Sequence, residues 1–237
     1  GLQVLEAPTG GPPRRLGGGP KAKLARAVQV QGGFAYVADG SNGIRVLDLA
    51  DPAAPVEAAV LDLAGGEAWD LALSEGKAFV ADRLGLKVFD LSNPRAPQLI
   101  GGRESPGWAR DVVVGAGHAF LADGERGLVV MDLADLGDIS RVGDLDTSGE
   151  AWSLALDGSR LYIADGDGLR IVDVTDPVSP VLVGSLALPG EVQELALNGS
   201  TVLLAAGSAG LLLVDASDPA APKLTACAER VAATAGC

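Results

Sequence analysis

The residues best suited to bind a ligand lie at two positions that recur roughly every 42 residues along the chain. At the first position, the successive residues are Arg26, Trp69, Arg110, Trp152 and Gln193. Two residues earlier, the second position holds Leu24, Glu67, Trp108, Glu150 and Glu191, so all three tryptophans fall in these two positions. Indole rings, guanidinium groups and carboxylates together make a surface for a peptide, a glycan or another small polar ligand.

We therefore predict a ligand-binding surface from side chains that differ between the copies. In a repeat protein, residues that maintain the fold recur, whereas residues that bind a partner are free to vary. The predicted ligand-binding residues are Arg26, Trp69, Trp108, Arg110, Glu150, Trp152 and Gln193. The alternative is structural: Trp69 and Trp152 would pack between repeats, and the two arginines would pair with Glu67, Glu150, Asp70 or Asp111.

Catalytic motifs give no comparable signal. The sequence contains no nucleophile elbow, phosphate-binding Walker loop or Cys-His pairing, and its one histidine, His118, is too few for a multi-histidine metal centre. We predict no catalytic residues and favour a protein that is not an enzyme. Paired acids, as Glu67 with Asp70 or Glu150 with Glu191, are the alternative and would suit a hydrolase or lyase.

A third recurring position is acidic in four copies, where it holds Asp39, Asp82, Asp123 and Asp165. Each follows an alanine and precedes a short turn, which in three of the copies reads Asp-Gly. Asp is a common cap of such turns, and glycine supplies the positive φ values that they need. We expect these carboxylates to be structural and predict no cofactor; calcium, which prefers oxygen ligands, is the alternative.

These positions belong to a repeat that reads most clearly at 161–180. An apolar stretch ends in Ala-Asp, a glycine turn follows, a second stretch reads Leu-x-Val-x-Asp, and an Asp-Pro-x-x-Pro corner ends it. With a further apolar stretch on either side, the unit is four short strands with no helical period. Four strands in about 42 residues predict an all-β protein, a β-propeller of four-stranded blades.

The repeat predicts one β-propeller domain over 1–237. Full repeats are expected at 24–62, 67–104, 108–146, 150–188 and 191–227, with a partial blade at 1–20 and a closing tail at 228–237. We predict six blades, the sixth being a composite of the two chain ends. Five blades with a docked N-terminal arm is the alternative.

The repeated strands resemble a known family. Leu169–Asp173, Leu128–Asp132 and Leu211–Asp215, together with Tyr36-Val-Ala-Asp-Gly40, resemble the LVIVD-repeat family of bacterial proteins over nearly all of 24–227. The resemblance implies a β-propeller and an exported or surface-attached protein, in an extracellular, cell-surface or periplasmic location. It supplies no catalytic residues, and a fold alone does not define a function.

The amino-acid composition limits the kinds of partner that we expect. The net charge is −13, from 31 acidic and 18 basic residues, which argues against nucleic acid because phosphate binding needs basic patches. The charge favours solubility and attraction of basic partners. No apolar run of 18 residues is present, so we expect no membrane span. Cys227 and Cys237 are expected either to form a disulfide that pins the C-terminal tail in an oxidising compartment or to stay as two thiols.

The sequence thus predicts a non-catalytic repeat scaffold at the cell surface. In a propeller the variable side chains converge on the mouth of the central channel, where they would bind a protein, peptide or glycan. The alternatives are a carboxylate-based hydrolase or lyase at the same funnel, and a purely structural domain of a larger surface protein. The oligomeric state is left open by the sequence.

Overall fold

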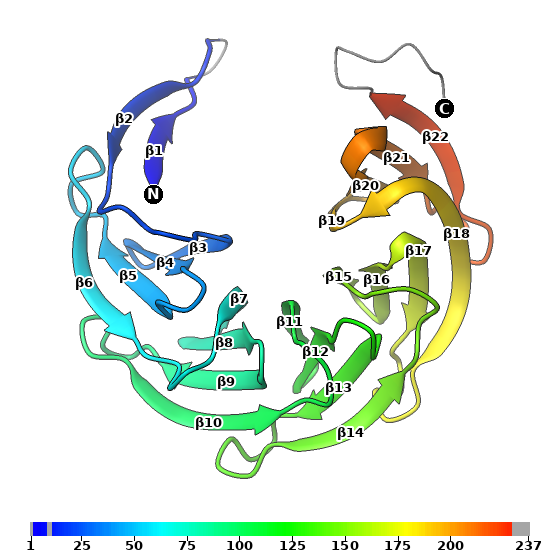
Figure 1. Cartoon of the computed structure of the whole chain (residues 1–237), viewed down its shortest axis with the longest axis horizontal. Coiled ribbons are helices and arrows are strands. Elements are labelled where there is room, and N and C mark those ends of the chain that lie inside the picture. Colours follow the sequence, from blue (N-terminus) through cyan, green and yellow to red (C-terminus); the bar gives the residue numbers. More distant parts are fainter. Residues whose placement is uncertain (1, 9–10, 229–237) are drawn as a thin grey trace.

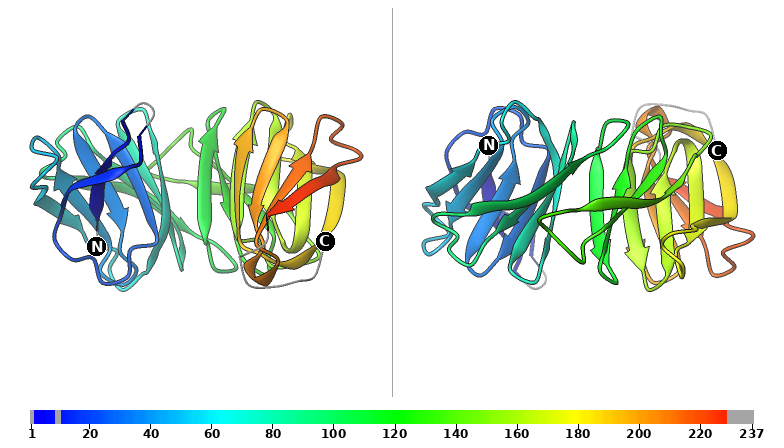
Figure 2. Two further views of the ribbon diagram at one scale, coloured as in Figure 1. Left: turned by 90° about the horizontal axis from the view of Figure 1, so that it is seen from above. Right: turned by 90° about the horizontal axis from the view of Figure 1, so that it is seen from below.

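The computed structural model describes residues 2–8 and 11–228. They form an arc of antiparallel sheets around a central channel, with the N-terminal and C-terminal sheets on either side of an opening (Figure 1). Side views show the sheets standing next to one another, with their turns on the two faces of the arc (Figure 2). Five sheets have four strands and one has two, as expected for the predicted all-β propeller with about six blades.

Each four-stranded sheet is one blade, and its strands run in chain order from the channel outwards (Figure 1). The first blade contains β3 (Ala27–Gln31), β4 (Phe34–Ala38), β5 (Ile44–Asp48) and β6 (Val56–Leu61). The second contains β7 (Ala68–Ser74), β8 (Lys77–Asp82), β9 (Gly85–Asp90) and β10 (Gln98–Glu104). The third contains β11 (Asp111–Gly115), β12 (His118–Ala122), β13 (Leu128–Asp132) and β14 (Ser140–Leu145).

The remaining sheets complete the arc. The fourth blade contains β15 (Ser153–Asp157), β16 (Arg160–Ala164), β17 (Gly166–Asp173) and β18 (Val181–Val192). The fifth contains β19 (Glu194–Asn198), β20 (Thr201–Ala205), β21 (Leu211–Asp215) and β22 (Lys223–Ala228), with one turn of 3₁₀ helix, η1 (Gly207–Ala209). The two-stranded sheet pairs β1 (Gln3–Glu6) with β2 (Arg14–Gly18).

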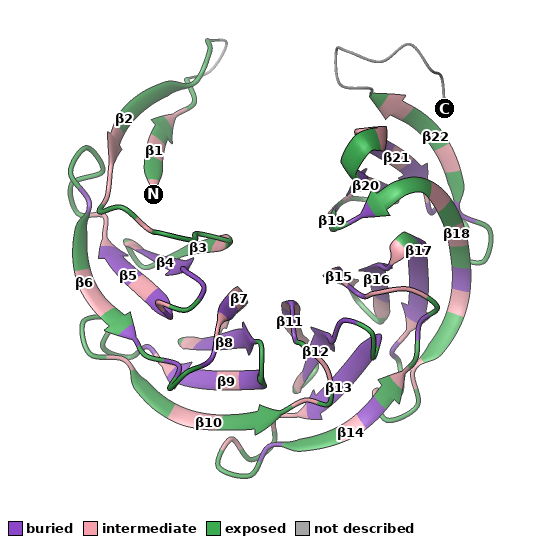
Figure 3. Cartoon of the chain, in the orientation of Figure 1, coloured by how far each residue is buried: buried purple, intermediate pink, exposed green. Residues whose placement is uncertain are grey.

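The core lies between blades and not inside any one of them. Val46 of the first blade and Val80 of the second share one cluster, and Leu86 of the second and Leu121 of the third share the next. Central strands are therefore covered on both faces, which explains their near-continuous apolar sequences. Figure 3 shows the result: burial concentrates in the central strands, and exposure in the outermost ones.

The Asp that ends each third strand braces the backbone beyond it. Its Oδ1 accepts the N–H group two residues later at 2.8–2.9 Å in all five blades. This Asx-turn geometry turns the chain towards the outer strand. Its recurrence explains why Asp48, Asp90, Asp132, Asp173 and Asp215 are the most regular feature of the sequence.

Two predictions concern residues outside the described ranges. Only Ala228 of the predicted closing tail, 228–237, is described, so the composite sixth blade stays a prediction. Cys227 lies in β22, whereas its predicted disulfide partner Cys237 lies outside the described residues. Within 2–8 and 11–228, no helix is long and apolar enough to cross a membrane.

Candidate functional site

Four buried aspartates hold the loops that lead to the channel. Asp39, Asp82, Asp123 and Asp165 are completely buried, and each lies at or just after the end of the second strand of its blade. They accept the backbone N–H groups of Leu24, Glu67, Gly107 and Gly149 at 2.6, 2.9, 2.7 and 3.1 Å, respectively. These partners lie in the loops that enter the innermost strands. The recurring aspartates therefore position the residues at the channel mouth.

Three of these aspartates lie close to a basic side chain of the same blade. Arg45, Lys87 and Arg170 lie 3.7, 3.2 and 3.1 Å from Asp39, Asp82 and Asp165, respectively. Burial raises the pKa of Asp123 and of Asp165, and hydrogen bonds from the hydroxyls of Ser105 and Thr147 oppose that rise. Within the described part of the chain, no three His, Cys, Asp or Glu residues are grouped so that they could hold a metal ion.

A stack of alternating arginine and tryptophan side chains surrounds the channel mouth. We call it the collar, and its members are Arg26, Trp69, Arg110 and Trp152. The Cζ atom of Arg26 lies 3.5 Å from the ring centroid of Trp69. The Cζ atom of Arg110 lies 5.1 Å from the Trp69 ring and 3.5 Å from the Trp152 ring. Cation–π attraction of about 0.5–2 kcal/mol per contact stabilises such a stack, with the larger values where water is excluded.

The backbone fixes the collar in place. The N–H groups of Arg26, Arg110 and Trp152 donate to the carbonyls of Ala38, Ala122 and Ala164, each at 2.8 Å. These acceptors are the alanines of the recurring Ala-Asp signature. In the second blade, the pairing register of β7 with β8 shifts between Ala68 and Asp70, so Trp69 lies at an irregularity. Bulges of this kind commonly redirect a side chain at a functional surface.

Glutamates compensate the charge of the collar arginines. Arg110, whose side chain is 7% exposed, forms an ion pair with Glu150. Burial lowers the pKa of Arg110, and the carboxylate of Glu150 opposes that effect. A guanidinium nitrogen of Arg26 lies 3.9 Å from Glu67. The structural alternative was thus right about the pairs with Glu67 and Glu150; Asp70 and Asp111 form no such pair among the described residues.

Three N–H groups of the collar have no acceptor among the described residues. They are Nε1 of Trp69, Nε1 of Trp152 and Nε of Arg110, and all three atoms are buried. A buried donor without a partner costs about 1–3 kcal/mol. The collar therefore carries unmet hydrogen-bonding capacity, all of it of the donor type.

Directly below the collar lies a layer of acidic and hydroxyl side chains. We call it the floor, and its members are Asp70, Asp111, Ser153 and Glu194. Burial, followed by the charge of Asp111 and a hydrogen bond with its carboxyl, raises the pKa of Asp70 to about 9, which favours a protonated Asp70 at neutral pH. Ser153 donates to Glu194 at 3.1 Å, and burial raises the pKa of Glu194. Asp111 accepts the N–H of Leu154 at 2.7 Å, which links neighbouring blades.

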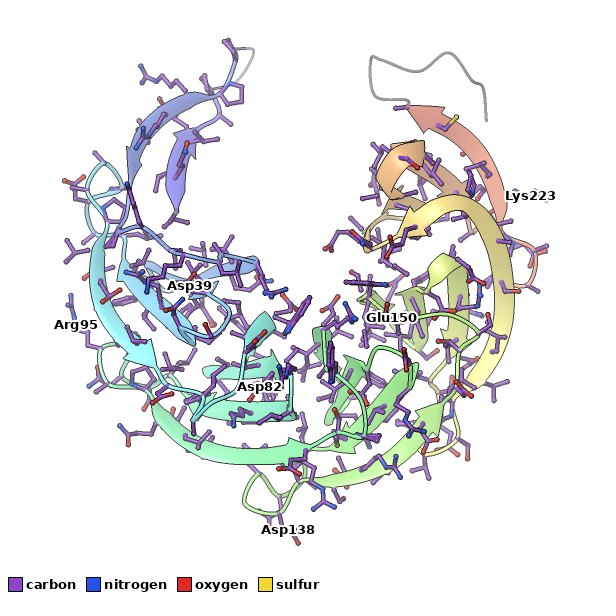
Figure 4. All side chains as sticks on the ribbon, viewed as in Figure 1. Asp39, Asp82, Arg95, Asp138, Glu150 and Lys223 are labelled. Atoms are coloured by element: carbon purple, nitrogen blue, oxygen red, sulfur yellow. The ribbon has the colours of Figure 1, made fainter. Side chains whose placement is uncertain are left out.

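The collar and three floor residues line a cavity of about 670 Å³ at the centre of the arc. Its walls include all four collar residues, Gln193, and Asp70, Asp111 and Glu194 of the floor. The same three floor residues also border a second cavity, of about 430 Å³. In Figure 4, Glu150 lies beside the central opening, while Arg95, Asp138 and Lys223 lie at the outer edge of the arc.

The predicted ligand-binding residues are divided between two hollows. Arg26, Trp69, Arg110, Trp152 and Gln193 line the central cavity. Trp108 and Glu150 line a separate pocket of about 390 Å³ with Gly107, Gly124 and Arg126 among its other residues. Trp108 is 54% exposed, and the guanidinium of Arg83 lies 5.5 Å from its ring centroid. The structure thus separates the central cavity, which the collar lines, from a smaller aromatic pocket that contains Trp108.

Sequence reasoning missed the floor as a unit. The carboxyl pair that forms is Asp70 with Asp111, whereas Glu67 pairs with Arg26 and Arg83, and Glu150 pairs with Arg110. The alternative pairs, Glu67 with Asp70 and Glu150 with Glu191, are not joined by a hydrogen bond among the described residues. A signal was available, because the position after the collar also differs between copies and reads Ala27, Asp70, Asp111, Ser153 and Glu194.

Comparison with solved structures supports the fold. The chain is 16% identical to a protein from Lactobacillus plantarum, with a TM-score of 0.77, over 86% of this chain and 70% of that one. It is 14% identical to the β-propeller domain of Cps50 (Swd1) from Myceliophteria thermophila, with a TM-score of 0.71, over 90% and 74%. It is 13% identical to the computationally designed protein Ika8, with a TM-score of 0.71, over 91% of this chain but only 65% of the designed one.

Family comparison identifies the repeat itself. No curated protein matches the chain. The model of the LVIVD repeat matches five times, at residues 23–62, 65–102, 106–147, 148–187 and 189–227. These matches account for most of the sequence and coincide with the five four-stranded blades. The chain therefore belongs to the LVIVD repeat family and folds as a β-propeller.

Proposed function

We propose that this propeller is a non-catalytic scaffold that binds an extended segment of a partner protein at the channel mouth. The observation that carries the proposal is that five side chains from equivalent positions, which differ between repeats, line one cavity. A volume of about 670 Å³ lies within the usual range of ligand sites, about 300–1,000 Å³. Propellers commonly use one face in this way.

A peptide suits the collar better than a sugar does. Sugars bind by stacking on free indole faces, but guanidinium groups lie against Trp69 and Trp152. What the collar offers is N–H donors without acceptors, and a peptide main chain supplies a row of carbonyl acceptors. The net charge of −13 also favours basic segments and accelerates their encounter with the protein.

The test is a selection of 12-residue peptides from a displayed library, followed by calorimetry. We expect selected peptides to lose at least about 30-fold in affinity for the Trp69→Ala/Trp152→Ala variant, the loss typical of central anchor residues. Val56→Ala, an exposed change on an outer strand, is the control and should bind as the parent protein does. Gln193→Ala, a milder change in the same cavity, covers the case in which the double variant unfolds.

Two outcomes would contradict the proposal. One is a library from which no peptide is enriched. The other is a set of peptides whose affinity is unchanged by both the tryptophan and the Gln193 variants. A glycan that binds and depends on Trp108 would move the site to the neighbouring pocket, where an indole ring is exposed.

A second candidate, a carboxylate-based hydrolase or lyase, is favoured by one observation. Asp70 and Asp111 both line the cavity, and the pKa of Asp70 is raised to about 9 by burial and by the charge of Asp111, as in enzymes whose two carboxyls act as acid and base. The test is a panel of glycoside, lactone and peptide substrates. Turnover that is lost in Asp70→Asn and Asp111→Asn would establish it, and turnover that survives both variants would reject it.

We also propose that the protein acts outside the cytoplasm, at the cell surface or in the periplasm. The proposal is supported by the resemblance of its repeats to those of exported proteins and by the two cysteines close to the C-terminus. Protease treatment of intact cells tests it. Degradation before lysis is expected for a surface protein, and protection until the cytoplasmic membrane is broken would contradict it.

A further inference from the structure

The floor is the feature that the proposed peptide site leaves unexplained. Asp70, Asp111 and Glu194 come from the innermost strands β7, β11 and β19 and border the central cavity. None of them takes part in an ion pair with a basic residue among the described part of the chain. Asp70 and Asp111 are half-buried, and Glu194 is more exposed. Carboxyls that are partly removed from water are normally paired or neutralised. Here the raised pKa of Asp70 favours a proton on one of the three.

An independent feature of the same cavity points to a ligand. Arg110 is 8% exposed and lines the cavity, yet its Nε has no hydrogen-bond partner. A ligand that binds the Nε–H group of Arg110 must supply a hydrogen-bond acceptor beside the collar. A ligand that binds the floor must supply a hydrogen-bond donor or a cation beside its carboxyls. A peptide with a basic side chain has both, since its carbonyl accepts and its side chain donates.

We propose that the floor binds the ammonium group of a lysine side chain from the partner segment, with Asp70, Asp111 and Glu194 as its acceptors. The inference rests on the proposed function and names the chemistry of the segment. The lysine stem would pass the indole rings of Trp69 and Trp152, and its three N–H donors would meet carboxyls from three different strands. The proton on Asp70 would leave to solvent as the ammonium takes its place, so the charge of the site is conserved.

Lysine fits this floor better than arginine does. An ammonium is compact and its donors rotate, whereas a guanidinium is a rigid planar fork that prefers one carboxylate in a bidentate arrangement. A guanidinium would also have to pass those of Arg26 and Arg110. The ammonium can approach because the charges of these two arginines are compensated by Glu67 and Glu150, and its smaller head passes their guanidinium groups more easily.

The test uses four capped pentapeptides, Gly-Gly-X-Gly-Gly, in which X is lysine, Nε-acetyl-lysine, arginine or norleucine. Calorimetry at neutral pH is expected to give the lysine peptide at least a tenfold higher affinity than the acetyl-lysine peptide. In buffers of different ionisation enthalpy, the binding heat should reveal proton release. The charged groups around Asp70 are Asp111, Glu194, Arg26 and Arg110, so Asp111→Asn and Glu194→Gln should each reduce both signals.

The outcomes separate this inference from the proposed function. If selected peptides need Trp69 and Trp152 but bind equally with lysine or acetyl-lysine, the floor inference is overturned and the peptide site stands. If no peptide depends on the collar, both fail. If calcium alone binds and this binding is lost in Asp111→Asn, the floor is a metal site instead. Asp138→Asn, an exposed change at the outer edge, is the matched control.

Discussion

Two rings of side chains around the channel differ in sequence and in contacts: the four turn aspartates, which we call the support ring, and the collar. The turn aspartates are the same residue in four blades, are completely buried, and accept backbone N–H groups from the loops that enter the innermost strands. The collar residues differ from blade to blade, interact with one another across blades, and retain donors without acceptors. From this difference we infer that the recurring aspartates support the fold, and we propose that the variable collar residues bind a ligand.

The largest expected effect breaks the support ring. In Asp165→Ala, the guanidinium of Arg170 would lose a buried partner, and the N–H of Gly149 would lose its acceptor. Breaking a buried ion pair in this way costs about 3–5 kcal/mol. We expect the melting temperature to fall by roughly 6–20 °C, at about 2–4 °C per kcal/mol for a protein of this size. Asp138→Ala, at the exposed outer edge, is the control and should melt with the parent protein.

We expect a smaller loss of stability when a collar residue is replaced. Trp152→Ala would remove the cation–π contact with Arg110 and part of the packing around it, at a cost of about 2 kcal/mol. Urea unfolding measures this directly. The comparison of the two rings would collapse if Trp152→Ala destabilised the protein as much as Asp165→Ala does, because the collar would then be part of the support.

The pH dependence of stability tests the floor. The pKa of Asp70 rises from its ordinary 3.8 to about 9 on folding, so between about pH 4 and 9 the folded state keeps a proton that the unfolded state releases. The free energy of unfolding should therefore fall as the pH rises across this range. Asp70→Asn should flatten the slope and make the protein more stable than the parent at pH 8, as measured by urea unfolding at several pH values.

The slope should be reduced rather than abolished in that variant. Burial also raises the pKa of Asp123, Asp165 and Glu194, which act in the same direction. Asp111, Glu194, Arg26 and Arg110 line the cavity with Asp70 and set its charge environment. A parent protein whose stability rises steadily from pH 5 to pH 8 would refute the raised pKa of Asp70.

The smallest effect concerns the exposed aspartates that end the third strands. Hydrogen bonds from Thr175 lower the pKa of Asp173, and those from Ser217 lower the pKa of Asp215. Their stabilising effect is present above the ordinary pKa of 3.8 and is lost as the pH falls through the lower folded-state value. Asp173→Ala should melt slightly below the parent protein at neutral pH and together with it in strong acid. A difference that persists in acid would show that the hydrogen bonds are not the cause.

Much of the fold could be read from the sequence because its determinants are local and repeated. The Ala-Asp signature, the glycine turns and the Leu-x-Val-x-Asp strands each recur at nearly constant spacing, and together they define the four-stranded blade. Five of the seven side chains that the sequence suggested for a binding surface line the central cavity, and Trp108 and Glu150 lie in a separate pocket. Whether either hollow binds a ligand stays a prediction.

The contacts within the site were beyond the reach of the sequence. The spacing of Arg26, Trp69, Arg110 and Trp152 does not reveal that their rings and guanidinium groups overlap, because this depends on rotamers and on the tilt between blades. The pairing of Asp70 with Asp111 depends on burial and on a close approach of two carboxyls from different strands. The separation of Trp108 from the collar likewise follows from the path of one loop.

The collar residues are attached to the scaffold through their main chains. The N–H groups of Arg26, Arg110, Trp152 and Gln193 all donate to an alanine carbonyl of their own blade, at 2.8–3.1 Å. A main-chain bond of this kind accepts any side chain except proline. Four of the five blades therefore hold the residue at this position by the same main-chain bond. Recognition can thus evolve there by single substitutions, and duplication of such a blade would lengthen the recognition sequence by one residue.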